Sequence, residues 1–294
     1  MKELLYYQSK TSLISLEPRR TVQAKLAGSY LTKMKGRGME FDEARHYQPG
    51  DDIRAIDWRV TARTGKTHTK LFREEKERPV FLVVDLSNSM HFGTQLLFKS
   101  VQAAHLASLV AWCAAKRGDR IGGLVFNENE HREFKPMTRQ KAVLSLLNGL
   151  KQMHHPHATT NNDQDSLTEA CARIRRLARP GSIVIMISDF LAFSEKAQQH
   201  INRVARHCEV LAYRISDIFE HQLPDVKTPQ IVSITDGVNK QSFTLGAKNQ
   251  AQAYEKAHQK EFDEVKRRLQ QSLVQVIDVS AASPLEAQLN PMVR

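Results

Sequence analysis

The feature that most constrains the fold is a regular alternation, after Pro79, of short apolar runs with longer segments of helical periodicity. The runs are short, rich in β-branched residues and bounded by turn signals, which is typical of strands buried on both faces of a sheet. They span Val80–Val84, Ile121–Phe126, Ile183–Ile187, Val210–Ile215 and Val274–Val279. Strands that alternate with helices predict a mostly parallel sheet with helices on both faces. We therefore expect an α/β fold.

The segments between these runs predict the helices. They span residues 95–116, 139–150, 166–178, 195–207 and 247–271. The first is apolar on most of its circumference and ends at Lys116-Arg117-Gly118, where cations followed by glycine indicate a helix C-terminus. Residues 231–245 are an exception, because Asp236-Gly237 between two strand-like runs predicts a hairpin.

Composition and charge limit the classes of function. The longest apolar runs are far shorter than the roughly 20 residues of a membrane span, so we expect no integral membrane segment. The start of the chain lacks the pattern of a secretory signal peptide, and 3 widely spaced cysteines exclude a disulfide framework, so a cytoplasmic location fits best. The net charge of +11 favours an anionic partner, but the excess is spread along the chain without a block of like charges.

Oxygen-bearing side chains follow the first strand and are the strongest candidate site. The strand runs directly into Asp85-Leu86-Ser87-Asn88-Ser89. Ligands of open α/β sheets bind beyond the carboxyl ends of strands, near the point where strand order reverses. A second strand ends in Ser188-Asp189, and Thr159-Thr160 opens the loop before a later helix. Carboxylate and hydroxyl oxygens suit Mg²⁺ or Mn²⁺. The candidate metal ligands are therefore Asp85, Ser87, Ser89, Thr159 or Thr160, and Asp189, the last either directly or through a water molecule.

Two other interpretations of this loop are available. In the structural one, Asp85 only ends a strand and the serines only cap the next helix. In the catalytic one, the apolar strand ending in Asp belongs to a phosphotransferase of the haloacid dehalogenase type. Such an enzyme has a second Asp two residues on, where this chain has Ser87, so the general acid is missing. We therefore expect no enzymatic activity, and metal-assisted phosphoester hydrolysis remains the less favoured alternative.

The segment before Pro79 mixes both signs of charge over residues 36–63, around a tight turn at Pro49-Gly50. One interpretation is a salt-bridged layer strapped across the sheet edge, with Trp58 and Ile56 as buried anchors. The other is a docking face for a partner, formed by Arg45, Asp51, Asp52, Arg54, Asp57, Trp58 and Arg63. Binding of nucleic acid would favour fewer acidic residues and more aromatic ones, so nucleic acid is an unlikely partner.

Two sets of motifs resemble known families. The Asp85–Ser89 loop, with Thr159 or Thr160 and with Asp189, resembles the metal-ion-dependent adhesion site (MIDAS) of von Willebrand factor A domains. Residues 36–41, 45–58 and 62–63 resemble the signature of the domain of unknown function 58 family, and the likeness covers residues 30–280. That resemblance implies a bacterial accessory protein that works beside a MoxR-type AAA+ ATPase in assembly, chaperone-like or stress functions. Many members carry N-terminal membrane helices, which are not found in this sequence.

Together these observations predict a Rossmann-like von Willebrand factor A-type domain over residues 79–282. We expect a charged N-terminal segment, residues 1–78, packed on it, and a tail at residues 283–294. The predicted function is metal-dependent protein recognition, with Mg²⁺ or Mn²⁺ as cofactor and an acidic residue of the partner completing the metal shell. The expected partners are a MoxR-type AAA+ ATPase and other von Willebrand factor A proteins, which would bring the protein to the inner membrane peripherally. A basic nucleic-acid-associated factor is the alternative.

Overall fold

The computed structural model describes residues 1–16, 39–74, 78–154, 166–224, 226, 230–235, 240–246 and 248–289. The chain divides into two compact units. The large unit comprises Met1–Val22 together with Arg78–Arg294, and the small unit comprises Gln23–Glu77. The first residues of the chain therefore belong with the large unit, whereas the sequence analysis grouped them with the segment that ends at residue 78.

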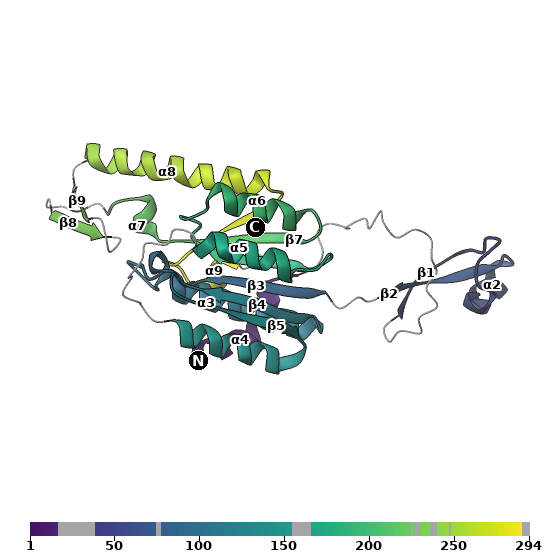
Figure 1. Ribbon diagram of the computed structural model, residues 1–294. Coiled ribbons are helices and arrows are strands. Elements are labelled where there is room, and N and C mark those ends of the chain that lie inside the picture. Colours follow the sequence, from purple (N-terminus) through teal and green to yellow (C-terminus); the bar gives the residue numbers. More distant parts are fainter. Residues whose placement is uncertain are drawn as a thin grey trace. The chain divides into compact units, whose positions relative to one another are not determined.

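A six-stranded sheet forms the centre of the large unit, with strand order β10-β7-β6-β3-β4-β5 (Figure 1). The strands are β3 (Pro79–Asp85), β4 (Arg120–Phe126), β5 (His131–Met137), β6 (Ile183–Ser188), β7 (Glu209–Ser216) and β10 (Gln275–Ser280). All neighbours pair in parallel except β4 and β5, which are antiparallel. The chain continues from β3 to β4 on one side and reaches β6 on the other, so strand order reverses between β3 and β6.

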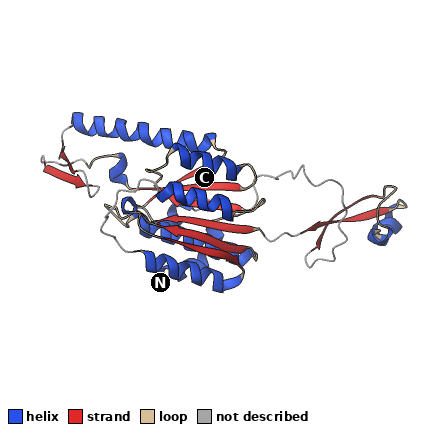
Figure 2. Cartoon of the chain, viewed as in Figure 1, coloured by secondary structure: helices blue, strands red, loops and turns tan. Residues whose placement is uncertain are grey.

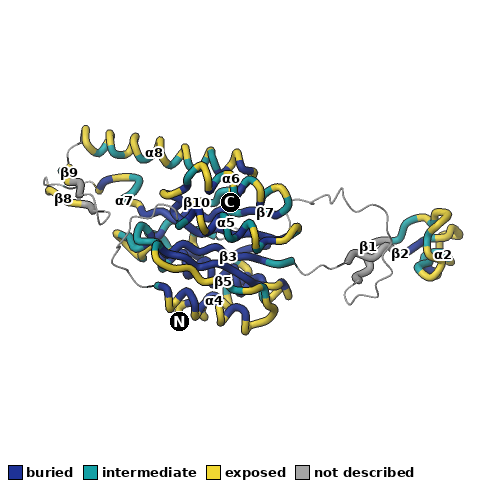
Figure 3. Tube along the Cα trace, viewed as in Figure 1, coloured by how far each residue is buried: buried dark blue, intermediate teal, exposed yellow. Residues whose placement is uncertain are grey.

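Helices cover both faces of this sheet (Figure 2). The helices α3 (Lys99–Arg117) and α4 (Arg139–Met153) contribute to one hydrophobic core, and α5 (Ser166–Leu177), α6 (Glu195–Ala205) and the end of α8 (Lys248–Gln271) contribute to the other. Successive side chains of a strand point to opposite faces. Accordingly Leu82 and Val84 lie in the first core, and Phe81 and Val83 in the second. Figure 3 shows the resulting buried central strands. The predicted mixed α/β fold with a mainly parallel sheet is confirmed.

The N-terminal residues explain why α3 is apolar on most of its circumference. Helix α1 (Lys2–Tyr6) and the 3₁₀ segment η1 (Tyr7–Leu13) pack against α3 within the large unit. The Ser108 hydroxyl donates to the Leu4 carbonyl at 2.5 Å, and the Cys113 thiol donates to the Ile14 carbonyl at 3.3 Å. The helix thus lies between the sheet and the N-terminal segment, so both of its sides are buried.

Three elements differ from the prediction. Helix α3 begins at Lys99 rather than residue 95, because the preceding loop folds back and the Lys99 N–H donates to the Phe92 carbonyl at 2.8 Å. Strand β5 was not expected, since most of its residues are polar and exposed, and an edge strand lacks a continuous apolar run. In the stretch assigned to a tail, α9 (Leu285–Leu289) places Leu285 in the core.

The remaining elements of the large unit lie near the carboxyl end of the sheet or beyond it. They are η3 (Asn88–Met90), α7 (Ile218–His221), and the antiparallel pair β8 (Gln230–Thr235) and β9 (Lys240–Leu245). The pairing of β8 with β9 agrees with the predicted hairpin, whereas its turn at residues 236–239 is outside the described residues.

The small unit is built on an antiparallel pair, β1 (Met39–His46) and β2 (His68–Glu74). Between them lie η2 (Ile53–Ala55) and helix α2 (Trp58–Thr64). Helix α2 has clear end signals, because the Asp57 carboxylate accepts the N–H groups of Arg59 and Val60 at 3.0 and 3.1 Å. Gly65 ends the helix with a φ of +69°, a conformation that favours glycine.

Candidate functional site

The predicted metal loop lies at the carboxyl edge of the sheet, where strand order reverses. Asp85 is the last residue of β3 and is only 4% exposed. One carboxylate oxygen accepts the Ser87 N–H at 2.9 Å, and the other accepts the Ser188 hydroxyl, from the end of β6, at 2.6 Å. Asp85 is therefore held by its own loop and by the neighbouring strand.

The two predicted serines lie beside each other. Ser87 Oγ and Ser89 Oγ are 3.2 Å apart and both side chains are half-buried at the start of η3. With Asp85 they form the part of the predicted ligand set that the structure brings together. The two candidate threonines, Thr159 and Thr160, lie outside the described residues.

The carboxylate of Asp189 pairs with a cation of the chain itself. The Nζ atom of Lys99 lies 2.8 Å from Asp189 Oδ2, and it also pairs with Glu220 of α7. The Lys99 side chain is fully buried, and its two acceptors are the residue that follows β6 and a residue of α7. Asp189 therefore belongs to a buried Asp189–Lys99–Glu220 triad.

Sequence reasoning missed Lys99, although a signal was present. A cation in the first turn of a helix is opposed by the helix dipole, so a lysine that begins an otherwise apolar helix calls for an acidic partner. Glu220 is held in place by α7, in which the Asp217 N–H donates to the Glu220 carboxylate at 3.0 Å and the Asp217 side chain caps the helix. Contacts within α7 therefore hold the Glu220 carboxylate in position independently of the lysine.

Charge at this edge is unevenly compensated. Burial, together with the negative charge of Asp189, raises the pKa of Asp85 to about 7. Burial alone would lower the pKa of Lys99, but the charges of Asp189 and Glu220 reverse this and raise it, so the ammonium stays charged. The lysine compensates its two partners, whereas Asp85 forms no ion pair with a cation among the described residues and holds its proton more tightly.

A further carboxylate from the loop after β4 contacts the same region. The Asn88 N–H donates to Glu128 Oε1 at 2.5 Å, and Glu128 Oε2 is buried without a hydrogen-bond partner among the described residues. A buried carboxylate oxygen without a partner adds negative charge to the edge near η3. Sequence reasoning missed Glu128, although a signal was present, because Glu128 lies two residues after the predicted strand Ile121–Phe126.

These residues fit a divalent cation in part. Asp85, Ser87 and Ser89 offer hard oxygens of the kind that Mg²⁺ and Mn²⁺ prefer. Asp189 is already engaged in this arrangement, its Oδ2 by the Lys99 ammonium and its Oδ1 by the Leu191 N–H, so its negative charge is shared with the lysine. Within the part of the chain that the structure describes, no cluster of three or more His, Cys, Asp and Glu side chains is arranged to hold a metal. A cation here would therefore depend on hydroxyl ligands.

The predicted partner-binding residues of the small unit fall into two sets. The acidic ones are engaged locally: Asp51 pairs with Arg45 at 2.7 Å and Asp52 accepts the Arg54 N–H at 3.0 Å, while Asp57 caps α2. Trp58, in contrast to these acidic residues, has a side chain that is 68% exposed. Trp58, the first residue of α2, is thus not a buried anchor within its own unit.

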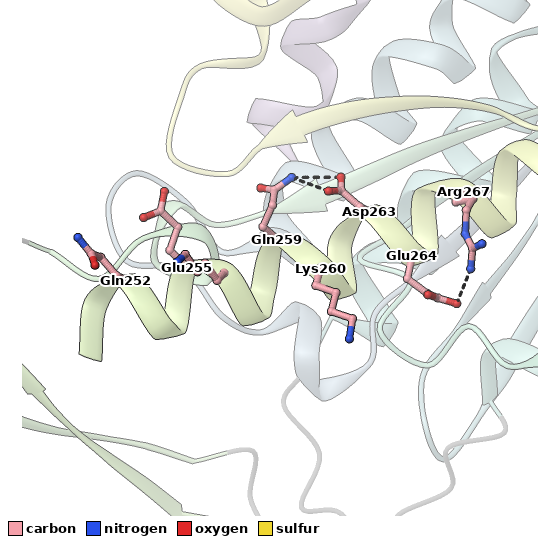
Figure 4. Close-up of a pocket in the computed structure, with 8 residues that line it drawn as sticks. Gln252, Glu255, Gln259, Lys260, Asp263, Glu264 and Arg267 are labelled. Atoms are coloured by element: carbon pink, nitrogen blue, oxygen red, sulfur yellow. Dashed lines mark hydrogen bonds and ion pairs between the residues drawn. The ribbon is translucent and has the colours of Figure 1, made fainter. Parts of the chain in front are cut away.

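A surface pocket elsewhere runs along α8 (Figure 4). Its lining is polar and charged, and its side chains pair along the helix, Gln259 with Asp263 and Arg267 with Glu264 at 3.1 Å. None of the lining residues is among the predicted ligands. The pocket therefore shares no lining residue with the candidate metal site at the carboxyl edge of the sheet.

Comparisons with known proteins agree with the motifs of the small unit and the sheet. The sequence profile of the family described as "Protein of unknown function DUF58" matches residues 43–264. The uncharacterized protein Rv1480 of Mycobacterium tuberculosis (strain ATCC 25618 / H37Rv) is 32% identical over 225 residues, which cover 76% of this chain and 70% of that protein. The uncharacterized protein YeaD of Bacillus subtilis (strain 168) is 31% identical over 102 residues, 34% of this chain and 25% of that protein.

Solved structures give weaker likenesses. The conserved hypothetical protein BatB from Bacteroides thetaiotaomicron has a TM-score of 0.43 at 17% identity, covering 72% of this chain and 93% of that chain. An aerotolerance-related membrane protein from Bacteroides fragilis NCTC 9343 has a TM-score of 0.41 at 16% identity, covering 67% of this chain and 98% of that chain. Of the helices that the structure describes here, none is both long and apolar enough to span a membrane.

Proposed function

Because this chain belongs to the family of proteins of unknown function DUF58, we propose that it is a non-enzymatic protein-interaction module of the von Willebrand factor A type. It binds its partner at the carboxyl edge of the sheet, where Asp85, Ser87 and Ser89 hold Mg²⁺ or Mn²⁺. The observation that carries the proposal is the gathering of a buried carboxylate and two hydroxyls at the point of strand reversal. Ligand sites of open α/β sheets lie at this point.

The residues of the loop have separate tasks in this proposal. Asp85 is held in one orientation by Ser87 N–H and by the Ser188 hydroxyl, so one carboxylate arrangement is presented to the edge. Ser87 and Ser89 place their oxygens side by side. A bound divalent cation supplies the positive charge that attracts an acidic side chain of the partner. The raised pKa of Asp85, caused by burial and by Asp189, supports a need for positive charge here.

The exposed side chains of the small unit supply a second contact in the same proposal. Trp58, Arg54 and Arg63 are exposed, whereas the acidic residues of the segment are engaged by local backbone groups and by Arg45. Tryptophan and arginine are enriched at the centres of protein interfaces. The guanidinium groups of this set favour an acidic surface of the partner.

The resemblance noted in the sequence favours a MoxR-type AAA+ ATPase as the partner, with other von Willebrand factor A proteins in the same assembly. In this proposal the protein is cytoplasmic and reaches the inner membrane through its partners. Its role is that of an accessory or adaptor protein in bacterial assembly, chaperone-like or stress functions. Two features of the sequence support this assignment: the family signature at residues 36–41, 45–58 and 62–63, and the Asp85–Ser89 loop. Both occur in this one chain, which matches the family.

The test is capture of the purified MoxR-type ATPase of the same organism by the immobilised full chain, in Mg²⁺ or in EDTA. Wild-type protein is expected to retain the ATPase only in Mg²⁺. Asp85→Asn keeps a similar shape and loses the negative charge, so capture is expected to fall to background. Glu255→Gln, an exposed acid on α8, is the matched control and should capture as wild type does. Equal capture in Mg²⁺ and EDTA would refute the metal-dependent mechanism.

A further inference from the structure

The most unusual charge in the large unit is the ammonium of Lys99. The side chain is fully buried and contacts the carboxylates of Asp189 and Glu220, which follow β6 and β7. Burial of an unpaired charge is costly, so a buried lysine persists only where acids compensate it. Because three elements meet at its Nζ atom, Lys99 joins the start of α3 to the carboxyl ends of two strands.

The lysine is linked to the residues proposed to hold a cation through the end of β6. Lys99 donates to Asp189 at 2.8 Å, and Ser188, the residue before Asp189, donates its hydroxyl to the Asp85 carboxylate at 2.6 Å. The negative charge of Asp189 also acts on the Asp85 carboxyl group. An ammonium and a divalent cation both draw on the negative charge of the same acids, and they repel each other. Unlike a dissolved ion, the ammonium is covalently attached, so it is present at every metal concentration.

We propose that Lys99 is a built-in cation that withholds Asp189 from the metal shell and weakens the binding of Mg²⁺ or Mn²⁺ at Asp85. The sheet edge is then folded and partly neutralised without metal. Metal occupancy rises when a partner's carboxylate adds negative charge at the open side of the loop. Lys99 thereby couples metal uptake to partner binding, which keeps the site from being filled permanently. The inference rests on the proposed function, because it concerns the regulation of the same site.

The first test removes the charge with little change in shape. EDTA-treated full-length wild type, Lys99→Met and Asp85→Asn are titrated with Mg²⁺ by calorimetry, and their melting temperatures are measured with and without Mg²⁺. Lys99→Met is expected to bind Mg²⁺ at least about tenfold more tightly than wild type, because a nearby positive charge is gone. It should also melt lower than wild type in EDTA and recover in Mg²⁺. Unchanged or weaker Mg²⁺ binding by Lys99→Met would overturn the inference.

A second variant serves if Lys99→Met fails to fold. Lys99→Met/Asp189→Asn removes the buried pair together and leaves the net charge unchanged, so the fold is less disturbed. If Asp189 is not a ligand, the double variant should bind Mg²⁺ no more than about threefold more weakly than wild type. Loss of binding as complete as in Asp85→Asn would make Asp189 a ligand and overturn the inference.

Two results separate the inference from the proposed function. If Lys99→Met binds Mg²⁺ more tightly than wild type, but wild type captures its partner equally in Mg²⁺ and in EDTA, the inference holds and the metal-dependent mechanism of capture fails. If wild type captures its partner only in Mg²⁺ but Lys99→Met binds Mg²⁺ no more tightly, the proposed function holds and the inference fails. Absence of Mg²⁺ binding in wild type and in every Lys99 variant would overturn both.

Discussion

The charged clusters of the two units differ in where their counter-charges come from. At the sheet edge of the large unit, Lys99 is buried and its acidic partners are 90 and 121 residues away in the sequence. In the small unit, Asp51, Asp52 and Asp57 bind groups within six residues of themselves. Long-range pairs in a buried setting depend on the whole fold, whereas local pairs survive in any context that keeps the turn and the helix. Altering the same residue types should therefore lower stability by much more in the large unit than in the small unit.

The first prediction has the largest expected effect and tests this contrast directly. Lys99→Ala leaves two carboxylates without their buried counter-charge, so the free energy of unfolding of the large unit should fall by about 3–5 kcal/mol in EDTA. Urea unfolding of a Trp58→Phe background measures this, because Trp112 in α3 is then the remaining tryptophan. The control Arg45→Ala breaks a partly exposed pair and should cost the small unit at most about 1 kcal/mol, measured by the fluorescence of Trp58 in a Trp112→Phe background. Equal losses for the two variants would contradict the contrast.

The second prediction concerns a local acid. Asp57→Ala removes the acceptor for two N–H groups at the start of α2, so the small unit should lose about 1 kcal/mol of stability. The fluorescence of Trp58, the first residue of α2, monitors unfolding in a Trp112→Phe background. Asp57→Asn keeps a side-chain acceptor and should remain close to wild type. A loss as large as that of Lys99→Ala would mean that Asp57 has a long-range role.

The third prediction is a pH dependence confined to the large unit. Burial lowers the pKa of His105 below its usual value of about 6.5, although Glu3 opposes the shift. The unfolded chain therefore takes up the proton first as the pH falls, so stability should be full above about pH 6.5 and should decline below it. Melting temperatures of wild type and His105→Gln between about pH 5 and 7.5 measure the difference. Parallel pH curves for both proteins would show that His105 is not responsible.

The fourth prediction has the smallest effect on stability. Trp58 is 68% exposed, so Trp58→Ala should change the stability of the small unit by no more than about 0.5 kcal/mol. Capture of the partner should nevertheless fall, because exposed tryptophan at an interface carries much of the binding energy. Trp58→Phe is the graded control and should retain part of the capture. A large drop in stability with unchanged capture would assign Trp58 to the packing of the unit.

Much of the fold could be predicted because it depends on local pattern. Buried parallel strands are continuous apolar runs, and β3, β4, β6, β7 and β10 were found within a residue or two. Strand β5 was missed because an edge strand needs only one apolar face. The predicted start of α3 was wrong because Leu96 and Leu97 match the helical period, yet the loop before Lys99 folds back onto Phe92.

For the site, the sequence by itself determined that Asp85, Ser87 and Ser89 follow a buried central strand, since residues so close in the chain share one loop. The sequence likewise indicated membership of the family, through the motif at residues 36–41, 45–58 and 62–63. Only the tertiary structure decided which charge Asp189 meets. The order β7-β6-β3 brings Asp189 and Glu220 to the start of α3, and the closed interior there leaves Lys99 no access to water. An ion pair between distant residues depends on strand order and burial, and neither is encoded in the spacing of the residues that form it.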